Sequence, residues 1–174
     1  LLPLNDVYTS EEKTSVTVET ELTTEQTFIT YQEEYINTGS FAYTVLIAED
    51  NMELIAYFKQ MLGDKYNLLE AQNGLQAWNI MQEKCPDLVL SDVVMPELSG
   101  YELCSHIKQH PVYSHIPVIL LTAKTSMADQ IEGLSYGADA YICKPFNVNY
   151  LLLTIENRLN NREKIRIYYS TPKT

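Results

Sequence analysis

Five short apolar segments recur from residue 43 onward, and a stretch with helical periodicity follows each of them. The segments read YTVLIA, YNLLEA, DLVLSD, IPVILLTA and AYICKP. Unbroken apolar runs of this length are typical of strands buried on both faces, as in a parallel sheet covered by helices. Five such strands alternating with five helices predict an α/β fold, with a doubly wound parallel sheet and helices on both of its faces.

The helices are expected at residues 51–62, 74–84, 100–110, 125–135 and 147–161. In the last of these, Leu151, Ile155 and Leu159 fall on one face, as in an amphipathic helix. The end of the chain is mildly basic and too short for a helix-turn-helix domain, so residues 163–174 are expected to form a C-terminal linker.

Residues 1–41 differ in composition from the rest of the chain. They are rich in threonine and glutamate, contain few large apolar residues, and carry eight acidic residues against one lysine. A segment of this kind cannot bury enough apolar surface to fold alone. It is therefore predicted to be an irregular acidic tail or linker.

Charge and cysteine content exclude several classes of protein. The net charge is -11, and no basic patch suggests nucleic-acid binding. The cysteines, Cys85, Cys104 and Cys143, are scattered and form no CxxC pair, which argues for a reducing compartment and against a disulfide framework or a zinc site. The apolar runs are too short to span a membrane. We expect a cytoplasmic segment without nucleic-acid or membrane contacts of its own, although a longer parent protein can carry a membrane anchor.

Polar residues stand at the carboxyl ends of four of the expected strands. In open parallel sheets, ligands bind outside these ends, where the strand order reverses. Three acids, a hydroxyl and a lysine would therefore share one edge of the sheet. They are Glu49, Asp50, Asp92, Thr122 and Lys144.

This set of side chains favours one kind of chemistry. Three carboxylates in one crevice call for a divalent cation, and Mg²⁺ binds a few carboxylates together with phosphate oxygens. A carboxylate beside the metal can attack phosphorus, while lysine and threonine donate to the phosphoryl oxygens. The residues alone leave open whether Asp50 or Asp92 is the nucleophile. They also leave open a simpler interpretation, in which Asp50 and Asn51 only form a turn and cap the next helix.

Between about residues 42 and 162 the chain resembles the response-regulator receiver domain of two-component signalling. The motifs that carry the resemblance are the acidic pair followed by Asn51, DLVLSDVVMPELSG, LLTA and GADAYICKPF. The resemblance implies a flavodoxin-like strand order of 2-1-3-4-5. It also implies that Asp92 accepts a phosphoryl group from a phosphohistidine, and that Thr122 and Lys144 contact this group. The implied Mg²⁺ ligands are Glu49, Asp50, Asp92 and the backbone carbonyl of Val94.

The same resemblance implies how the signal is read out. Phosphorylation would turn the Thr122 hydroxyl, and Tyr141 would rotate into the space left behind. The face made by the helix at 125–135, the strand around Tyr141 and the helix at 147–161 would then change, and two copies would associate through it. A cis peptide before Pro145 is also implied.

The first residues, LLPLND, are similar to the end of a histidine-kinase ATP-binding domain. We therefore expect the parent to be a hybrid sensor kinase, in which the phosphohistidine donor can belong to the same chain. The segment itself is expected to be a signalling module rather than an enzyme.

Three other functions remain as alternatives. A Mg²⁺-dependent phosphatase with an aspartyl nucleophile would need a second acid where Val94 stands. A nucleotide binder would need a glycine-rich phosphate loop, and none is present. A pseudo-receiver that only docks partners would have lost some of the acids or the lysine. A zinc site at Glu102, His106 and His110, spaced along one helix, is less favoured than a solvated helix face.

Overall fold

The computed structural model describes residues 43–170. The chain divides into two units at residues 40 and 41, and the described part belongs to the second. The acidic segment 1–41 and its LLPLND motif lie outside the described residues. Within residues 43–170, no helix has the length and apolar character needed to cross a membrane.

Five parallel strands form one sheet in the order β2-β1-β3-β4-β5, which confirms the predicted flavodoxin-like arrangement. Strand β1 pairs in parallel with β2 on one side and with β3 on the other, so the strand order reverses between β1 and β3. The central strands β3 and β4 are buried along their whole length, as their unbroken apolar runs predict. The strand bounds are β1 Thr44–Ala48, β2 Asn67–Ala71, β3 Leu88–Asp92, β4 Val118–Thr122 and β5 Ala140–Cys143.

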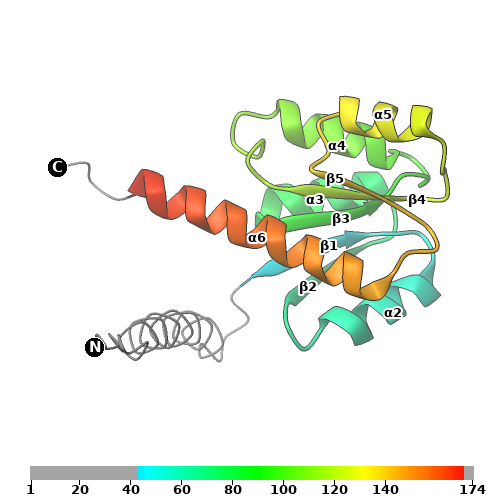
Figure 1. Cartoon of the computed structure of the whole chain (residues 1–174), viewed down its shortest axis with the longest axis horizontal. Helices are drawn as coiled ribbons and strands as arrows, with labels where there is room; N and C mark the ends of the chain where they lie inside the picture. Colours follow the sequence, from blue (N-terminus) through cyan, green and yellow to red (C-terminus); the bar gives the residue numbers. More distant parts are fainter. Residues whose placement is uncertain (1–42, 171–174) are drawn as a thin grey trace, which may run out of the picture. The chain divides into compact units, whose positions relative to one another are not determined.

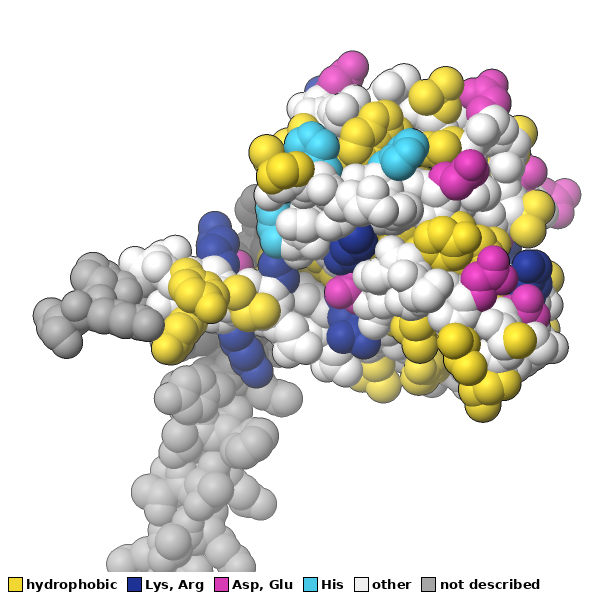
Figure 2. All heavy atoms as spheres, turned by 90° about the horizontal axis from the view of Figure 1, so that it is seen from above, with side chains coloured by type: hydrophobic (Ala, Val, Ile, Leu, Met, Phe, Trp, Pro, Cys, Tyr) yellow, Lys and Arg dark blue, Asp and Glu magenta, His cyan; other side chains and the backbone are white. Residues whose placement is uncertain are grey.

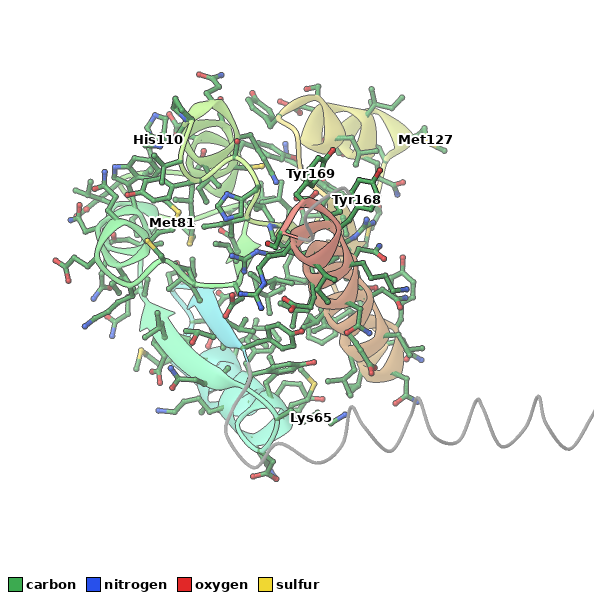
Figure 3. The ribbon with its side chains drawn as sticks, turned by 90° about the vertical axis from the view of Figure 1, so that its left-hand side faces the viewer. Lys65, Met81, His110, Met127, Tyr168 and Tyr169 are labelled. Carbon is green, nitrogen blue, oxygen red and sulfur yellow. The ribbon has the colours of Figure 1, made fainter. Side chains whose placement is uncertain are left out.

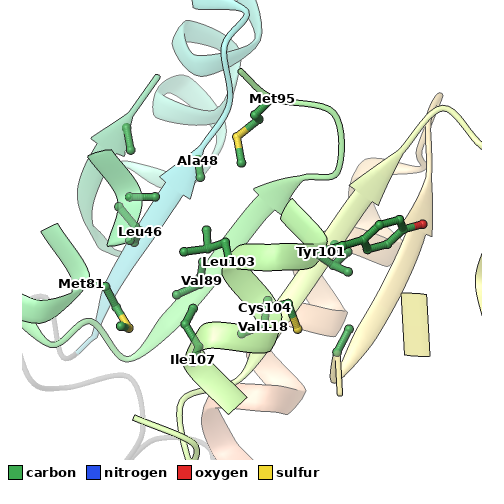
Figure 4. Close-up of a cluster of buried hydrophobic side chains, with 14 of the residues drawn as sticks. Leu46, Ala48, Met81, Val89, Met95, Tyr101, Leu103, Cys104, Ile107 and Val118 are labelled. Carbon is green, nitrogen blue, oxygen red and sulfur yellow. The ribbon is translucent and has the colours of Figure 1, made fainter. Parts of the chain in front are cut away.

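Helices cover both faces of this sheet (Figure 1). Helices α2 and α6 pack on one face, where Val45 and Ile47 of β1 join their buried side chains. Helices α3 and α4 pack on the other face, against Leu46 and Ala48 (Figure 4). The bounds are α2 Met52–Leu62, α3 Gly74–Lys84, α4 Gly100–Gln109, α5 Met127–Ser135 and α6 Val148–Ser170. The first four agree with the prediction to within two residues.

Polar side chains determine where several helices begin. Ser99 and Glu102 form a reciprocal capping box at α4, so the helix starts immediately after the loop that follows β3. Asn51, Asn73 and Ser126 cap α2, α3 and α5 through their side-chain oxygens. These four caps place the starts of α2, α3, α4 and α5 beside the carboxyl ends of the strands that precede them.

Helix α6 is longer than predicted. The prediction that it ends near residue 161 is wrong, and residues 163–170 of the expected linker are helical. The helix meets no glycine or proline before Pro172, and Arg162 anchors it to Asp87. Its last turns project beyond the sheet, with Tyr168 and Tyr169 at the exposed end (Figures 1 and 3).

Candidate functional site

Three carboxylates gather at the carboxyl edge of the sheet. Glu49 and Asp50 follow β1, and Asp92 is the last residue of β3. One oxygen of each lies within 4.8 Å of the others. Glu49 and Asp92 are buried, with 2% and 8% of their surface exposed, whereas Asp50 is exposed. The cluster is thus open to solvent on one side, where a ligand can enter.

Local hydrogen bonds hold the first acidic pair in position. The Asn51 side chain accepts hydrogen bonds from the backbone N–H groups of Glu53 and Leu54, at 2.9 and 3.2 Å. The Asn51 backbone N–H donates to Glu49 Oε1 at 3.2 Å. Asn51 is therefore the helix cap, and Asp50 remains free of that task.

The Lys144 ammonium bridges two of the carboxylates. Its Nζ lies 2.9 Å from Glu49 Oε2 and 3.1 Å from Asp92 Oδ2. Lys144 follows β5, and its peptide bond to Pro145 is cis. A residue at the far edge of the sheet thus reaches the centre of the acidic cluster.

The backbone around Asp92 is tightly fixed. Asp92 Oδ1 accepts a hydrogen bond from the N–H of Val93 at 2.7 Å, and the Ser91 hydroxyl donates to the Asp92 carbonyl at 2.8 Å. Gly100 lies against the same carbonyl, where an added Cβ would come within 2.0 Å of the oxygen. The start of α4 can approach β3 this closely only because residue 100 is glycine.

The charges in this cluster do not balance. Burial raises the pKa of Glu49, and the Asp92 carboxylate raises it further, although Lys144 opposes both effects. Burial lowers the pKa of Lys144, but its bonds to Glu49 and Asp92 outweigh this, and the net direction is upward. One ammonium faces three carboxylates, so an excess of negative charge remains when all are ionised. Oxygen donors with such an excess suit a hard divalent cation.

Thr122 and Tyr141 lie on the neighbouring strands β4 and β5. Thr122 is fully buried, and its hydroxyl accepts a hydrogen bond from the N–H of Lys124 at 3.0 Å. Tyr141 is half-buried, and its hydroxyl lies 3.2 Å from that of Tyr101 on α4. The role of Tyr101 could not be predicted from the sequence, because neither spacing nor periodicity relates it to Tyr141. Val94 lies in the loop after β3 and is 65% exposed.

The described residues do not support the zinc hypothesis. Glu102 is engaged in the capping box, and His110 Nδ1 accepts a hydrogen bond from the N–H of Val112. Both His106 and His110 pack edge-on against Trp78. Figure 2 shows histidine side chains next to hydrophobic ones on the surface. Among residues 43–170, only the cluster of Glu49, Asp50 and Asp92 groups enough ligands for a metal ion.

Known proteins resemble this chain over the described region. Residues 45–156 match the response regulator receiver domain family. A histidine kinase, P4, of Formosa agariphila is 48% identical over 130 residues, which cover 75% of this chain and 10% of that protein. The phosphate regulon transcriptional regulatory protein PhoB of Pseudomonas aeruginosa is 40% identical over 116 residues, which cover 65% of this chain and 50% of that protein. The chain thus spans half or less of these relatives.

Solved structures show the same fold. The signal receiver domain of a signal transduction histidine kinase from Syntrophus aciditrophicus superposes with a TM-score of 0.66 and 36% identity, covering 69% of this chain and 92% of that one. The BeF3-activated DrrB receiver domain gives a TM-score of 0.62 and 28% identity, covering 68% and 97%. With the matching fold and acidic edge, these similarities show that the chain belongs to the response regulator receiver domain family of two-component signalling.

Proposed function

We propose that this chain accepts a phosphoryl group on Asp92 from a phosphohistidine, in the presence of Mg²⁺. The observation that carries the proposal is the Lys144 ammonium, 2.9 Å from Glu49 and 3.1 Å from Asp92 within a cluster of three carboxylates. A purely structural cluster would pair each buried acid with a cation of its own. Here one cation is shared, and a ligand is needed to complete the charge balance.

In the proposed reaction an oxygen of the ionised Asp92 carboxylate attacks phosphorus. The oxygen–phosphorus bond forms as the phosphorus–nitrogen bond of the phosphohistidine breaks, and the imidazole leaves with the electron pair. No general base is needed, because the carboxylate carries no proton to remove. Lys144 transfers its hydrogen bond from the Asp92 carboxylate to an oxygen of the incoming group, and Thr122 supplies a second donor.

The ligands that we propose for Mg²⁺ are the carboxylates of Glu49, Asp50 and Asp92 and the backbone carbonyl of Val94. When bound, Mg²⁺ neutralises the excess negative charge and draws electron density from the phosphoryl oxygens. The three carboxylates fit this ion in donor type and in mutual distance.

We further propose that the phosphoryl group is read out on the surface of α5, β5 and α6. Once the Thr122 hydroxyl donates to the phosphoryl group, Tyr141 moves toward it and the surface above changes shape. Helix α5 exposes Met127, Ile131 and Leu134 there, which are 70%, 63% and 54% exposed. Apolar side chains at this spacing favour association of two copies through this surface.

The domain organisation that we propose is a linker at residues 1–41, a receiver at 42–162 and a connecting segment at 163–174. The similarity to a histidine kinase, of which the matched residues cover only 10%, supports a hybrid sensor kinase as the parent. Its phosphohistidine domain would be the donor, and the segment itself would act in the cytoplasm as a signalling module rather than an enzyme.

Incubation with acetyl phosphate and Mg²⁺, followed by intact-mass measurement, tests the proposal. The wild type should gain one phosphoryl group, and neither the Asp92→Asn variant nor chelated protein should gain any. Asp64→Asn changes an exposed acid outside the cluster and is the matched control, expected to label like the wild type. Equal labelling of Asp92→Asn and wild type would refute the assignment of the acceptor.

A further inference from the structure

The ring of Tyr141 packs closely against a glycine of α5. A Cβ added at Gly133 would lie 2.3 Å from both Cδ2 and Cε2 of the Tyr141 ring. Glycine is unfavourable inside a helix, so its presence at this buried position has a packing reason. The reason visible here is the space that the tyrosine ring needs.

The hydroxyl group of Tyr141, at the other end of the ring, lies within hydrogen-bonding distance of a side chain of α4. Tyr101 reaches from α4 toward β5 (Figure 4), and its hydroxyl lies 3.2 Å from the hydroxyl of Tyr141. Tyr101 is only 8% exposed, and its ring stacks on Tyr136 with 4.9 Å between the ring centres. Tyr101 is therefore held rigidly, and Tyr141 is the partner that can move.

A second set of contacts joins Tyr101 to the phosphoryl site. The backbone N–H of Lys124 donates to the Thr122 hydroxyl at 3.0 Å, and the ammonium of Lys124 lies 5.9 Å from the centre of the Tyr101 ring. If Thr122 turns toward a phosphoryl group, this N–H loses its acceptor and the loop is free to shift. The position of Lys124 over Tyr101 would change with it.

We infer that Tyr101 is a positioning residue for the switch: it holds Tyr141 against Gly133 in the unphosphorylated state and opposes activation. This inference rests on the proposed phosphorylation of Asp92 and goes beyond it, since it concerns the energetic balance between the two states. In the observed arrangement the Thr122 hydroxyl accepts a hydrogen bond from the N–H of Lys124, and the Lys144 ammonium pairs with Glu49 and Asp92, so both side chains would have to change partners to contact a phosphoryl group. The bond between the tyrosines therefore stabilises the resting state.

The coupling between ligand binding and the two states determines whether the loss of this hydrogen bond raises or lowers the ligand affinity. A ligand that binds only the activated state has an apparent affinity proportional to the population of that state. A single hydrogen bond that exists only in the resting state lowers this population by roughly twofold to tenfold. Its removal should raise the affinity for a phosphoryl analogue by the same factor.

The experiment is calorimetric titration with beryllofluoride, formed from beryllium and fluoride salts, at saturating Mg²⁺. Tyr101→Phe keeps the stacked ring and removes the hydroxyl, so its apparent affinity should exceed that of the wild type by about twofold to tenfold. Tyr141→Phe should give the same increase. The double variant should give no further increase, because both substitutions remove one shared bond.

Tyr136→Phe is the matched control. Tyr136 stacks on the same ring, but its hydroxyl makes no hydrogen bond within residues 43–170, so its affinity should equal that of the wild type. Urea unfolding of each variant distinguishes a positioning role of Tyr101 from a purely structural one. A purely structural Tyr101 would lower the stability and leave the beryllofluoride affinity unchanged.

The outcomes distinguish the two proposals. If the wild type binds beryllofluoride but Tyr101→Phe binds it equally or more weakly, the inference about Tyr101 is wrong and Asp92 can remain the acceptor. If the wild type does not bind, or Asp92→Asn binds equally well, the proposed function fails and the inference falls with it.

Discussion

The two edges of the sheet differ in how their carboxylates are paired with cations. At the amino edge, Asp87 accepts a hydrogen bond from the N–H of Thr44 at 2.8 Å and pairs with Arg162. Asp139 accepts one from the N–H of Val118 at 2.8 Å and pairs with Lys108 at 2.7 Å. Each carboxylate there has one backbone donor and one cation of its own.

At the carboxyl edge, Glu49, Asp50 and Asp92 lie together, and Lys144, which pairs with Glu49 and Asp92, is the one cation that pairs with this cluster among the described residues. Both edges combine acidic with basic side chains, but the carboxyl edge has more acids for each cation. Removing one partner of a balanced pair costs stability, whereas an excess of buried negative charge is costly until a cation binds. The difference between the edges therefore distinguishes structural carboxylates from those available for chemistry.

The largest effect on stability is expected at the amino edge. Asp139→Ala should lower the free energy of unfolding by about 2 kcal/mol, because the buried start of β4 loses its acceptor and Lys108 loses its partner. Urea unfolding measures this loss. Glu70→Ala is the control, since it breaks an exposed pair with Lys59 and should cost less than about 1 kcal/mol. Equal losses would mean that the pairing at this edge is unimportant.

The carboxyl edge should respond with the opposite sign. In the presence of a chelator, Asp92→Asn should raise the free energy of unfolding by about 1 kcal/mol, because it removes one negative charge from a cluster of three carboxylates that pairs with a single ammonium. The same urea experiment measures the change. A loss of stability in this variant would show that the acidic cluster is balanced without a metal, and the contrast between the edges would disappear.

The smallest effect is expected from pH. Burial lowers the pKa of His115, and Arg162, with its Nη2 3.4 Å from His115 Nε2, lowers it further. A histidine whose pKa is depressed in the folded state contributes stability above its ordinary pKa of 6.5, and this contribution is lost as the pH falls. Between pH 7.5 and 5.5, the wild type should therefore lose slightly more stability than His115→Gln. A larger loss in the variant would contradict this sign.

Much of this molecule could be predicted from short stretches of sequence. The buried runs determine the strands, and four helices begin and end within two residues of their predicted bounds. The position of Glu49, Asp50 and Asp92 after buried strands was enough to predict a shared acidic edge, because parallel strands end at the same side of a sheet. The end of α6 was missed because its apolar periodicity stops at Leu159, whereas the helix continues to Ser170.

The sequence by itself determined the strands, their helices and the edge at which the acids meet, since these follow from local periodicity and from the direction of the chain. Only the tertiary structure decided which charges and hydroxyls become partners. Lys144 and Glu49 are 95 residues apart in the chain, and Tyr101 and Tyr141 are 40 residues apart. Such pairs form when packed helices and strands bring side chains within hydrogen-bonding distance, and no pattern of neighbouring residues encodes that distance.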